Sequence, residues 1–141
     1  MLSQQQLYQL LPQLPEALMA MTESAEHQLE PELIHMVRLR VSAINGCRFC
    51  IAMHTREAQQ SNITEATIAA LLNSPAASTF TAAQWAALQW AEALTSLSGH
   101  EPLKADIKRL QAHYRAEQIV ALCAVIIQIN GWNRVAIGFD F

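Results

Sequence analysis

The chain has 141 residues, of which 52% are apolar and 15% charged. This balance predicts a single compact domain, residues 1–141, and excludes a disordered protein. Nine Lys and Arg against twelve Asp and Glu give a net charge of −3, which argues against a nucleic-acid partner. The longest apolar run, residues 119–127, is far shorter than the roughly 20 residues of a membrane span. With no recognisable secretory leader, we expect a cytoplasmic protein with no membrane partner.

Helix-start and helix-end signals divide the chain into eight predicted helices. In chain order they cover Ser3–Leu11, Pro15–His27, Pro31–Ala43, Cys47–Gln60, Thr64–Leu72, Thr81 to a residue before Gly99, Pro102–His113 and Ala116–Ala136. No long stretch alternates apolar and polar residues, so the prediction is an all-α fold, a compact bundle of about six to eight helices. The last helix is apolar nearly all round between Ile119 and Ile129, which is typical of the centre of a bundle or of a subunit interface.

The strongest chemical pattern is Cys-x-x-Cys-x-x-x-His, formed by Cys47, Cys50 and His54. On a helix these three side chains fall on one face. Two cysteines at this spacing near a helix start can close a disulfide, and the free N–H groups there stabilise a thiolate. His54 follows Cys50 by one turn, so it is placed to accept the thiol proton or to pair with the thiolate.

Positive charge gathers around this motif, which would favour the thiolate. Four of the nine basic residues lie in or beside it, namely Arg38, Arg40, Arg48 and Arg56. No Asp or Glu occurs between Leu33 and Arg56. Each arginine taken singly could instead be solvated or paired with a carboxylate elsewhere.

Two other interpretations of the motif stay open. The cysteines and the histidine could be buried structural residues, or they could bind zinc with His35 as a fourth ligand. The third cysteine, Cys123, falls in the apolar run and is predicted to be structural, because free cysteine is commonly buried.

The segment Val37–Ala58 closely resembles the core motif of the alkylhydroperoxidase AhpD-like proteins, which belong to the carboxymuconolactone decarboxylase superfamily. The late segment Ile129–Arg134 resembles the Asn-x-Trp-Asn-Arg signature on the last long helix of that family. The resemblance extends from about Pro31 to the C-terminus, with the core motif in residues 31–60. It implies an all-α fold that assembles into a homo-trimer or homo-hexamer.

The resemblance also implies roles for the motif residues. By position, Cys50 would be the peroxidatic cysteine, Cys47 the resolving cysteine and His54 the proton acceptor. The implied cycle begins with attack of the Cys50 thiolate on a small hydroperoxide and continues through a sulfenic acid to a disulfide. An external dithiol or protein disulfide reductant then reduces the disulfide, and neither a cofactor nor a metal is required. The decarboxylase branch of the family lacks the cysteine pair, so the pair argues against that reaction.

One position departs from the family pattern. AhpD proteins carry a proton-relaying glutamate twelve residues before the first cysteine, and this chain has His35 there. Glu32, about one helical turn earlier, could reach the same place, or His35 could itself exchange protons near pH 7. The missing glutamate leaves open a thiol–disulfide redox partner with little peroxidase activity. The Cys and His residues of the motif, together with His35, leave open a non-enzymatic Cys/His metal-binding module.

Overall fold

The structure is a computed structural model that describes residues 1–97 and 104–141. In those residues it contains eight α-helices, two short 3₁₀ helices and no strand, which confirms the predicted all-α fold. The α-helices are α1 (Gln4–Leu10), α2 (Gln13–Ala20), α3 (Pro31–Asn45), α4 (Arg48–Gln60), α5 (Glu65–Leu72), α6 (Ala82–Thr95), α7 (Lys104–Gln111) and α8 (Ala116–Gly138). The 3₁₀ helices are η1 (Ala25–His27) and η2 (Ala77–Thr79).

Most predicted helix starts are confirmed to within a residue, because the capping residues are recognisable in the sequence. Ser3 and Thr81 each accept an N–H of the first turn in a capping box, and Thr64 caps α5 in the same way without the reciprocal bond. Helices α3 and α8 both extend two residues beyond their predicted ends. The predicted start of α7 at Pro102 lies outside the described residues.

The prediction of one helix from Pro15 to His27 is wrong. Helix α2 ends at Ala20, and η1 forms a separate turn after a short connection. In that connection Thr22 is buried, and its hydroxyl accepts a hydrogen bond of 2.8 Å from Nε2 of Gln128 on α8. Threonine has only a modest helix propensity. At Thr22 the tertiary hydrogen bond with Gln128 therefore replaces continuation of the helix.

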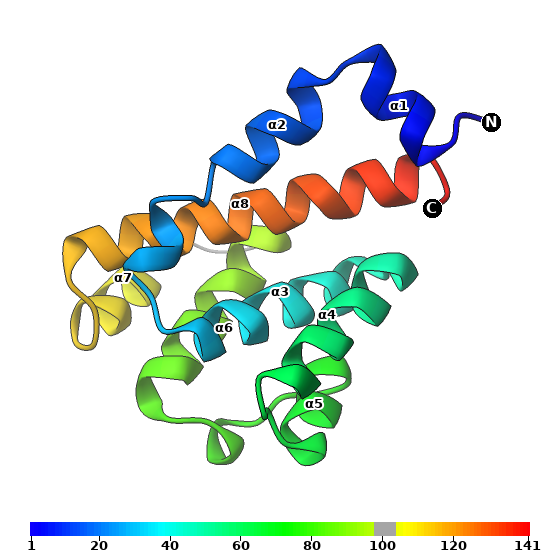
Figure 1. The fold of residues 1–141 in the computed structure, drawn as a ribbon. Helices are drawn as coiled ribbons and strands as arrows, with labels where there is room; N and C mark the ends of the chain where they lie inside the picture. Colours follow the sequence, from blue (N-terminus) through cyan, green and yellow to red (C-terminus); the bar gives the residue numbers. More distant parts are fainter. Residues whose placement is uncertain (98–103) are drawn as a thin grey trace.

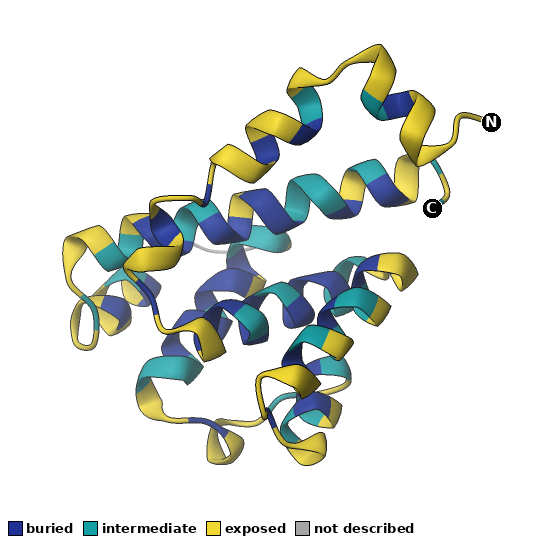
Figure 2. Cartoon of the chain, viewed as in Figure 1, coloured by how far each residue is buried: buried dark blue, intermediate teal, exposed yellow. Residues whose placement is uncertain are grey.

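Helix α8 runs through the middle of the fold, as its apolar character predicts. In Figure 1, α1 and α2 lie on one side of α8, and α3, α4 and α5 lie on the other. Helix α3 packs against α4, α5, α6 and α8. Its Val37 and Leu39 belong to the same core as Leu122 and Val125 of α8. Figure 2 shows buried residues concentrated on α3, α6 and α8, while α1 and α2 are largely exposed.

By length and composition alone, α8 is one helix of the described residues that could cross a membrane. It packs, however, against α2, α3, α4, α6 and α7, so part of its apolar surface is buried in the core of the fold. The two chain ends lie near each other beside the C-terminal end of α8 (Figure 1). This arrangement brings both ends close to Cys47 and Cys50 at the start of α4.

Candidate active site

The two cysteines of the motif form a disulfide at the start of α4. Gly46 adopts a left-handed conformation with φ of +68° and ends α3, so that Cys47 becomes the N-cap residue of α4. The Sγ atom of Cys47 also accepts a hydrogen bond of 3.3 Å from the backbone N–H of Cys50. The two residues are 1% and 2% exposed, so the sulfurs are reached only through recesses in the protein.

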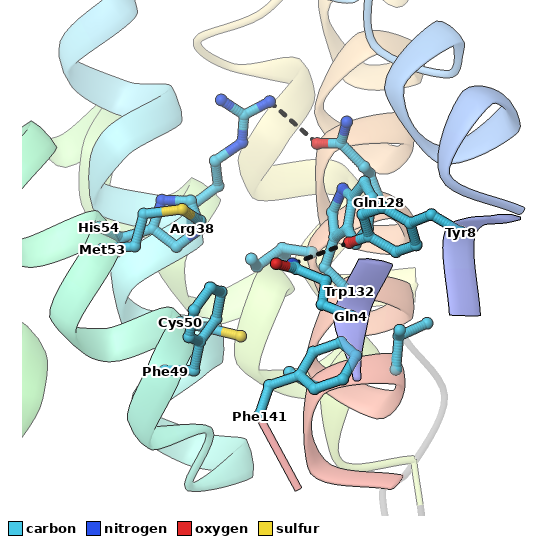
Figure 3. A pocket seen from close by; sticks show the side chains of 13 residues that line it. Gln4, Tyr8, Arg38, Phe49, Cys50, Met53, His54, Gln128, Trp132 and Phe141 are labelled. Carbon is cyan, nitrogen blue, oxygen red and sulfur yellow. Dashed lines mark hydrogen bonds between the residues drawn. The ribbon is translucent and has the colours of Figure 1, made fainter. Parts of the chain in front are cut away.

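Cys50 lines a cavity of about 240 Å³. The sulfur of Cys50 points into this space in Figure 3. The wall is largely aromatic and aliphatic and includes Tyr8, Phe49, Met53, Trp132, Val135 and Phe141. Because these side chains come from α1, α4, α8 and the last residue, the cavity exists only once the two ends of the chain have folded together. An apolar pocket with few polar groups is the usual form of a small-molecule site.

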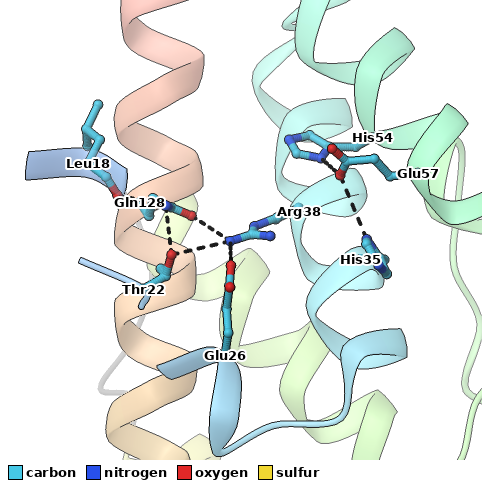
Figure 4. A network of polar contacts seen from close by, with 8 residues as sticks. All are labelled: Leu18, Thr22, Glu26, His35, Arg38, His54, Glu57 and Gln128. Atoms are coloured by element: carbon cyan, nitrogen blue, oxygen red, sulfur yellow. Dashed lines mark hydrogen bonds and ion pairs between the residues drawn. The ribbon is translucent and has the colours of Figure 1, made fainter. Parts of the chain in front are cut away.

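His54 lines the same cavity and is 5% exposed. Its Nδ1 atom lies 2.9 Å from Oε2 of Glu57, one turn later on α4. Nδ1 of His35, on α3, lies 3.8 Å from the same oxygen. Figure 4 shows this carboxylate between the two imidazole rings. One acidic group therefore faces two histidines that come from different helices.

The surroundings of His54 favour its neutral form. Burial lowers the pKa of this imidazole, while the hydrogen bond and the charge of Glu57 raise it, and burial has the larger effect. The pKa therefore lies below the ordinary 6.5, so the ring is mainly neutral at pH 7. With Nδ1 facing Glu57, Nε2 is the ring atom left to accept a proton.

The structure brings together three of the predicted site residues, Cys47, Cys50 and His54, and places His35 next to them through Glu57. Glu32 is not at this site: it is exposed in the first turn of α3 and lines a separate cavity with Tyr114. Sequence analysis did not single out Glu57, although its spacing of three residues from His54 on a predicted helix was an available signal.

The four arginines around the motif do not act as one positive cluster. Arg38 is the one that lines the Cys50 cavity, and it pairs with Glu26 at 3.0 Å and donates a 2.9 Å hydrogen bond to Oε1 of Gln128 (Figure 4). Arg40 instead pairs with Glu92 at 3.2 Å. Arg48 and Arg56 are exposed. Two of the four charges are thus neutralised by carboxylates and two are exposed, which agrees with the alternative that each arginine is paired or solvated.

The late segment Ile129–Arg134, with the Asn-x-Trp-Asn-Arg signature, holds α8 against α3 beside the cavity. Asn133 is fully buried, accepts a 2.9 Å hydrogen bond from Nδ2 of Asn45 and donates one of 3.1 Å to Oγ of Ser42. Asn45 also donates to Oδ1 of Asn130 at 3.0 Å. These bonds position Trp132, which lies between the two asparagines and forms part of the cavity wall.

Among residues 1–97 and 104–141, no three His, Cys, Asp or Glu side chains are arranged as ligands of one metal ion. The zinc interpretation therefore finds no support in the described part of the chain. Cys123 is half-buried against the main core, apart from the disulfide, and burial raises the pKa of its thiol. Both observations agree with the structural role predicted for it.

The chain is similar in sequence and structure to several known proteins. The model of the carboxymuconolactone decarboxylase family matches residues 12–93. The uncharacterized protein YdfG of Bacillus subtilis (strain 168) is 36% identical over 102 residues, which are 72% of this chain and 69% of YdfG.

Two crystal structures share the fold over most of the length of this chain. A protein of unknown function from Agrobacterium tumefaciens, described as a candidate AhpD antioxidant defence protein, is 32% identical with a TM-score of 0.86. The match covers 94% of this chain and 92% of that protein. An uncharacterized peroxidase-related protein from Silicibacter sp. TM1040 is 25% identical with a TM-score of 0.79, over 89% of this chain and 68% of that protein.

Proposed function

Because this chain belongs to the carboxymuconolactone decarboxylase family and has the AhpD-like fold, we propose that it is a thiol-dependent antioxidant enzyme that reduces a small hydroperoxide. One observation carries the proposal: Cys50, disulfide-bonded to Cys47, lines the same cavity as His54. Thiol peroxidase chemistry needs a cysteine pair that can cycle through a disulfide, a proton acceptor and a space for the substrate.

In the reduced protein, Nε2 of His54 accepts the proton of Cys50, and the Cys50 thiolate attacks the terminal oxygen of the hydroperoxide. The O–O bond breaks, and its electron pair leaves on the alkoxide, which takes the proton from His54 and departs as an alcohol. Cys50 is left as a sulfenic acid. The thiol of Cys47 then attacks Sγ of Cys50, which forms the disulfide and releases water.

An external dithiol or protein disulfide reductant completes the cycle by thiol–disulfide exchange. The donor supplies two electrons and two protons and becomes a disulfide itself, and Cys47 and Cys50 return to thiols. The residues named here carry the cycle without a cofactor. We propose the cytoplasm as the site of action, since thiol donors are kept reduced there.

The position of Glu57 supports a peroxidase rather than a thiol–disulfide redox partner with little peroxide turnover. The redox-partner alternative depended on His35, which occupies the position of the relay glutamate of the family. A carboxylate 2.9 Å from His54 offers the same chemical group from α4 instead of α3. It can hold the imidazole in one orientation and stabilise its protonated form during the reaction.

The test is the loss of thiols on addition of peroxide. One equivalent of hydrogen peroxide should remove two of the three thiols in each reduced chain, and peptide mapping should find them at Cys47 and Cys50. With dithiothreitol as donor, Cys50→Ser should abolish peroxide turnover, whereas the matched control Cys123→Ser should retain it. Full turnover in Cys50→Ser would refute the assignment.

A further inference from the structure

The two sulfur-bearing residues of the disulfide line different spaces. Cys50 lines the large cavity that also contains His54, whereas Cys47 lines a separate recess of about 120 Å³. Ala136 and Phe141 border both spaces, so the two spaces adjoin at these residues. A molecule in the recess therefore meets Cys47, and a molecule in the cavity meets Cys50.

The recess and the cavity also differ in chemical character. The cavity wall is mostly aromatic and aliphatic. The recess is bordered by Arg48 and Asp140, both exposed, and by Gly46, which presents no side chain. Charged groups of both signs suit a small hydrophilic molecule better than an apolar one. The volume of the recess, half that of the cavity, suits a thiol on a short chain.

We propose that the recess is the entry site of the reductant, a small hydrophilic thiol or dithiol that attacks Sγ of Cys47. This inference rests on the proposed function for the oxidising half of the cycle, but the reducing half can be measured on its own. In the first step a donor thiolate bonds to Sγ of Cys47, and the bond between Cys47 and Cys50 breaks. The electron pair leaves on Sγ of Cys50, which becomes a thiolate in the cavity beside His54.

A second donor thiol completes the reduction. It attacks the donor sulfur of the mixed disulfide, so that the donor leaves as a disulfide and Cys47 is released as a thiolate that takes up a proton. Access decides which sulfur is attacked, because exchange requires the incoming thiolate to reach its target sulfur. Attack on Cys47 also leaves Cys50 as the free thiolate, which is the form that the next hydroperoxide requires.

The first experiment identifies the attacked sulfur directly in the wild-type protein. The disulfide is formed with diamide, treated briefly with 2-mercaptoethanol and quenched with excess N-ethylmaleimide. Trypsin cleaves after Arg48, so the two cysteines fall on different peptides. We expect mercaptoethanol on the Cys47 peptide and maleimide on the Cys50 peptide. The opposite labelling, or equal labelling of both peptides, would overturn the proposal.

The second experiment uses a matched pair of variants on α8. Ile137 lines the recess and Val135 lines the cavity, and both are at least partly exposed. The rate of reduction by dithiothreitol and the rate of oxidation by hydrogen peroxide are measured separately for each variant. Ile137→Trp should lower the ratio of reduction to oxidation by about tenfold or more, and Val135→Trp should raise it, as expected when a bulky group narrows one entry only.

The two variants also separate this inference from the proposed function. If peroxide fails to oxidise any form while Ile137→Trp still slows reduction of the disulfide made with diamide, the peroxidase proposal fails and the reductant site stands. If both variants change the ratio in the same direction, the separate entry site is refuted whatever the peroxidase rate. The labelling experiment needs no variant, so it decides the question even if a tryptophan variant does not fold.

Discussion

The carboxylate of Glu57 lies 2.9 Å from Nδ1 of His54, one turn away on the same helix. The side chain of His54 is 7% exposed, and that of Glu57 is 39% exposed. Glu57 therefore connects a buried imidazole in the cavity to the protein surface. His35, whose Nδ1 lies 3.8 Å from the same carboxylate, is close enough to feel its charge but too far for a hydrogen bond.

This geometry predicts the effect of Glu57→Gln on the pH dependence of activity. Glu57 raises the pKa of His54 through its charge and its hydrogen bond, so its neutralisation lowers that pKa further. The acid limb of the profile of kcat/KM should therefore move to lower pH. On the pH-independent plateau, kcat/KM should fall by about tenfold or more, because the His54 imidazolium formed in the reaction loses its carboxylate partner.

The measurement is kcat/KM for hydrogen peroxide between pH 4.5 and 8, with Glu65→Gln on α5 as the matched control. Glu65 is exposed and accepts a hydrogen bond from Gln59 instead of a histidine, so its profile should match the wild type. An acid limb that stays in place in Glu57→Gln would show that His54 is not the group titrating there.

His35 should be less important than Glu57. Because its Nδ1 makes no hydrogen bond, His35→Ala should reduce kcat/KM at pH 7 by no more than about threefold, the size of a weak charge interaction. His35→Glu should reduce it more, since a second carboxylate beside Glu57 disfavours the ionised form of both. Equal losses in His35→Ala and Glu57→Gln would instead make His35 an essential part of the proton path.

The sequence predicted the elements and residues whose signals are local. The capping residues Ser3, Thr64 and Thr81 marked helix starts because each bonds to a backbone group three residues away. Cys47, Cys50 and His54 were recognisable because their helical spacing places them together. These features depend on a few neighbouring residues, so they can be read without the tertiary fold.

Features that depend on distant parts of the chain could not be predicted in this way. The end of α2 at Ala20 reflects the hydrogen bond of Thr22 with Gln128, more than a hundred residues later. Tyr8 and Phe141 reach the cavity from opposite ends of the chain. Glu57 is the exception: it lies on the predicted helix one turn after His54, so the spacing that identified the cysteines could have identified it too.

The burial of His54 also predicts how stability depends on pH. Its pKa is lowered in the folded protein, so below about pH 6.5 the unfolded chain binds a proton that the folded protein does not. The contribution of His54 is therefore complete above pH 6.5 and is lost as the pH falls toward the lowered folded value. The free energy of unfolding should decrease by up to about 1.4 kcal/mol for each pH unit in that window.

Urea unfolding at pH 7.5 and pH 5.5 provides the measurement. His54→Asn should lose part of the difference in unfolding free energy between the two pH values, whereas His113→Asn, at an exposed position, should keep it. An undiminished difference in His54→Asn would assign the pH dependence to other groups.

The exposed apolar side chains of α8 bear on the predicted assembly into three or six chains. Val120 and Ile127 are 70% and 52% exposed, and their spacing of seven residues places them on one stripe of the helix. Association of chains through this stripe would remove it from water.

We expect sedimentation velocity to give a trimer or a hexamer at micromolar protein, and Val120→Glu to give smaller species with unchanged helix content. Leu97→Glu, an exposed apolar position outside α8, serves as the control and should leave the assembly intact. A monomeric wild type would contradict the assembly, and an oligomer that persists in Val120→Glu would place its interface elsewhere.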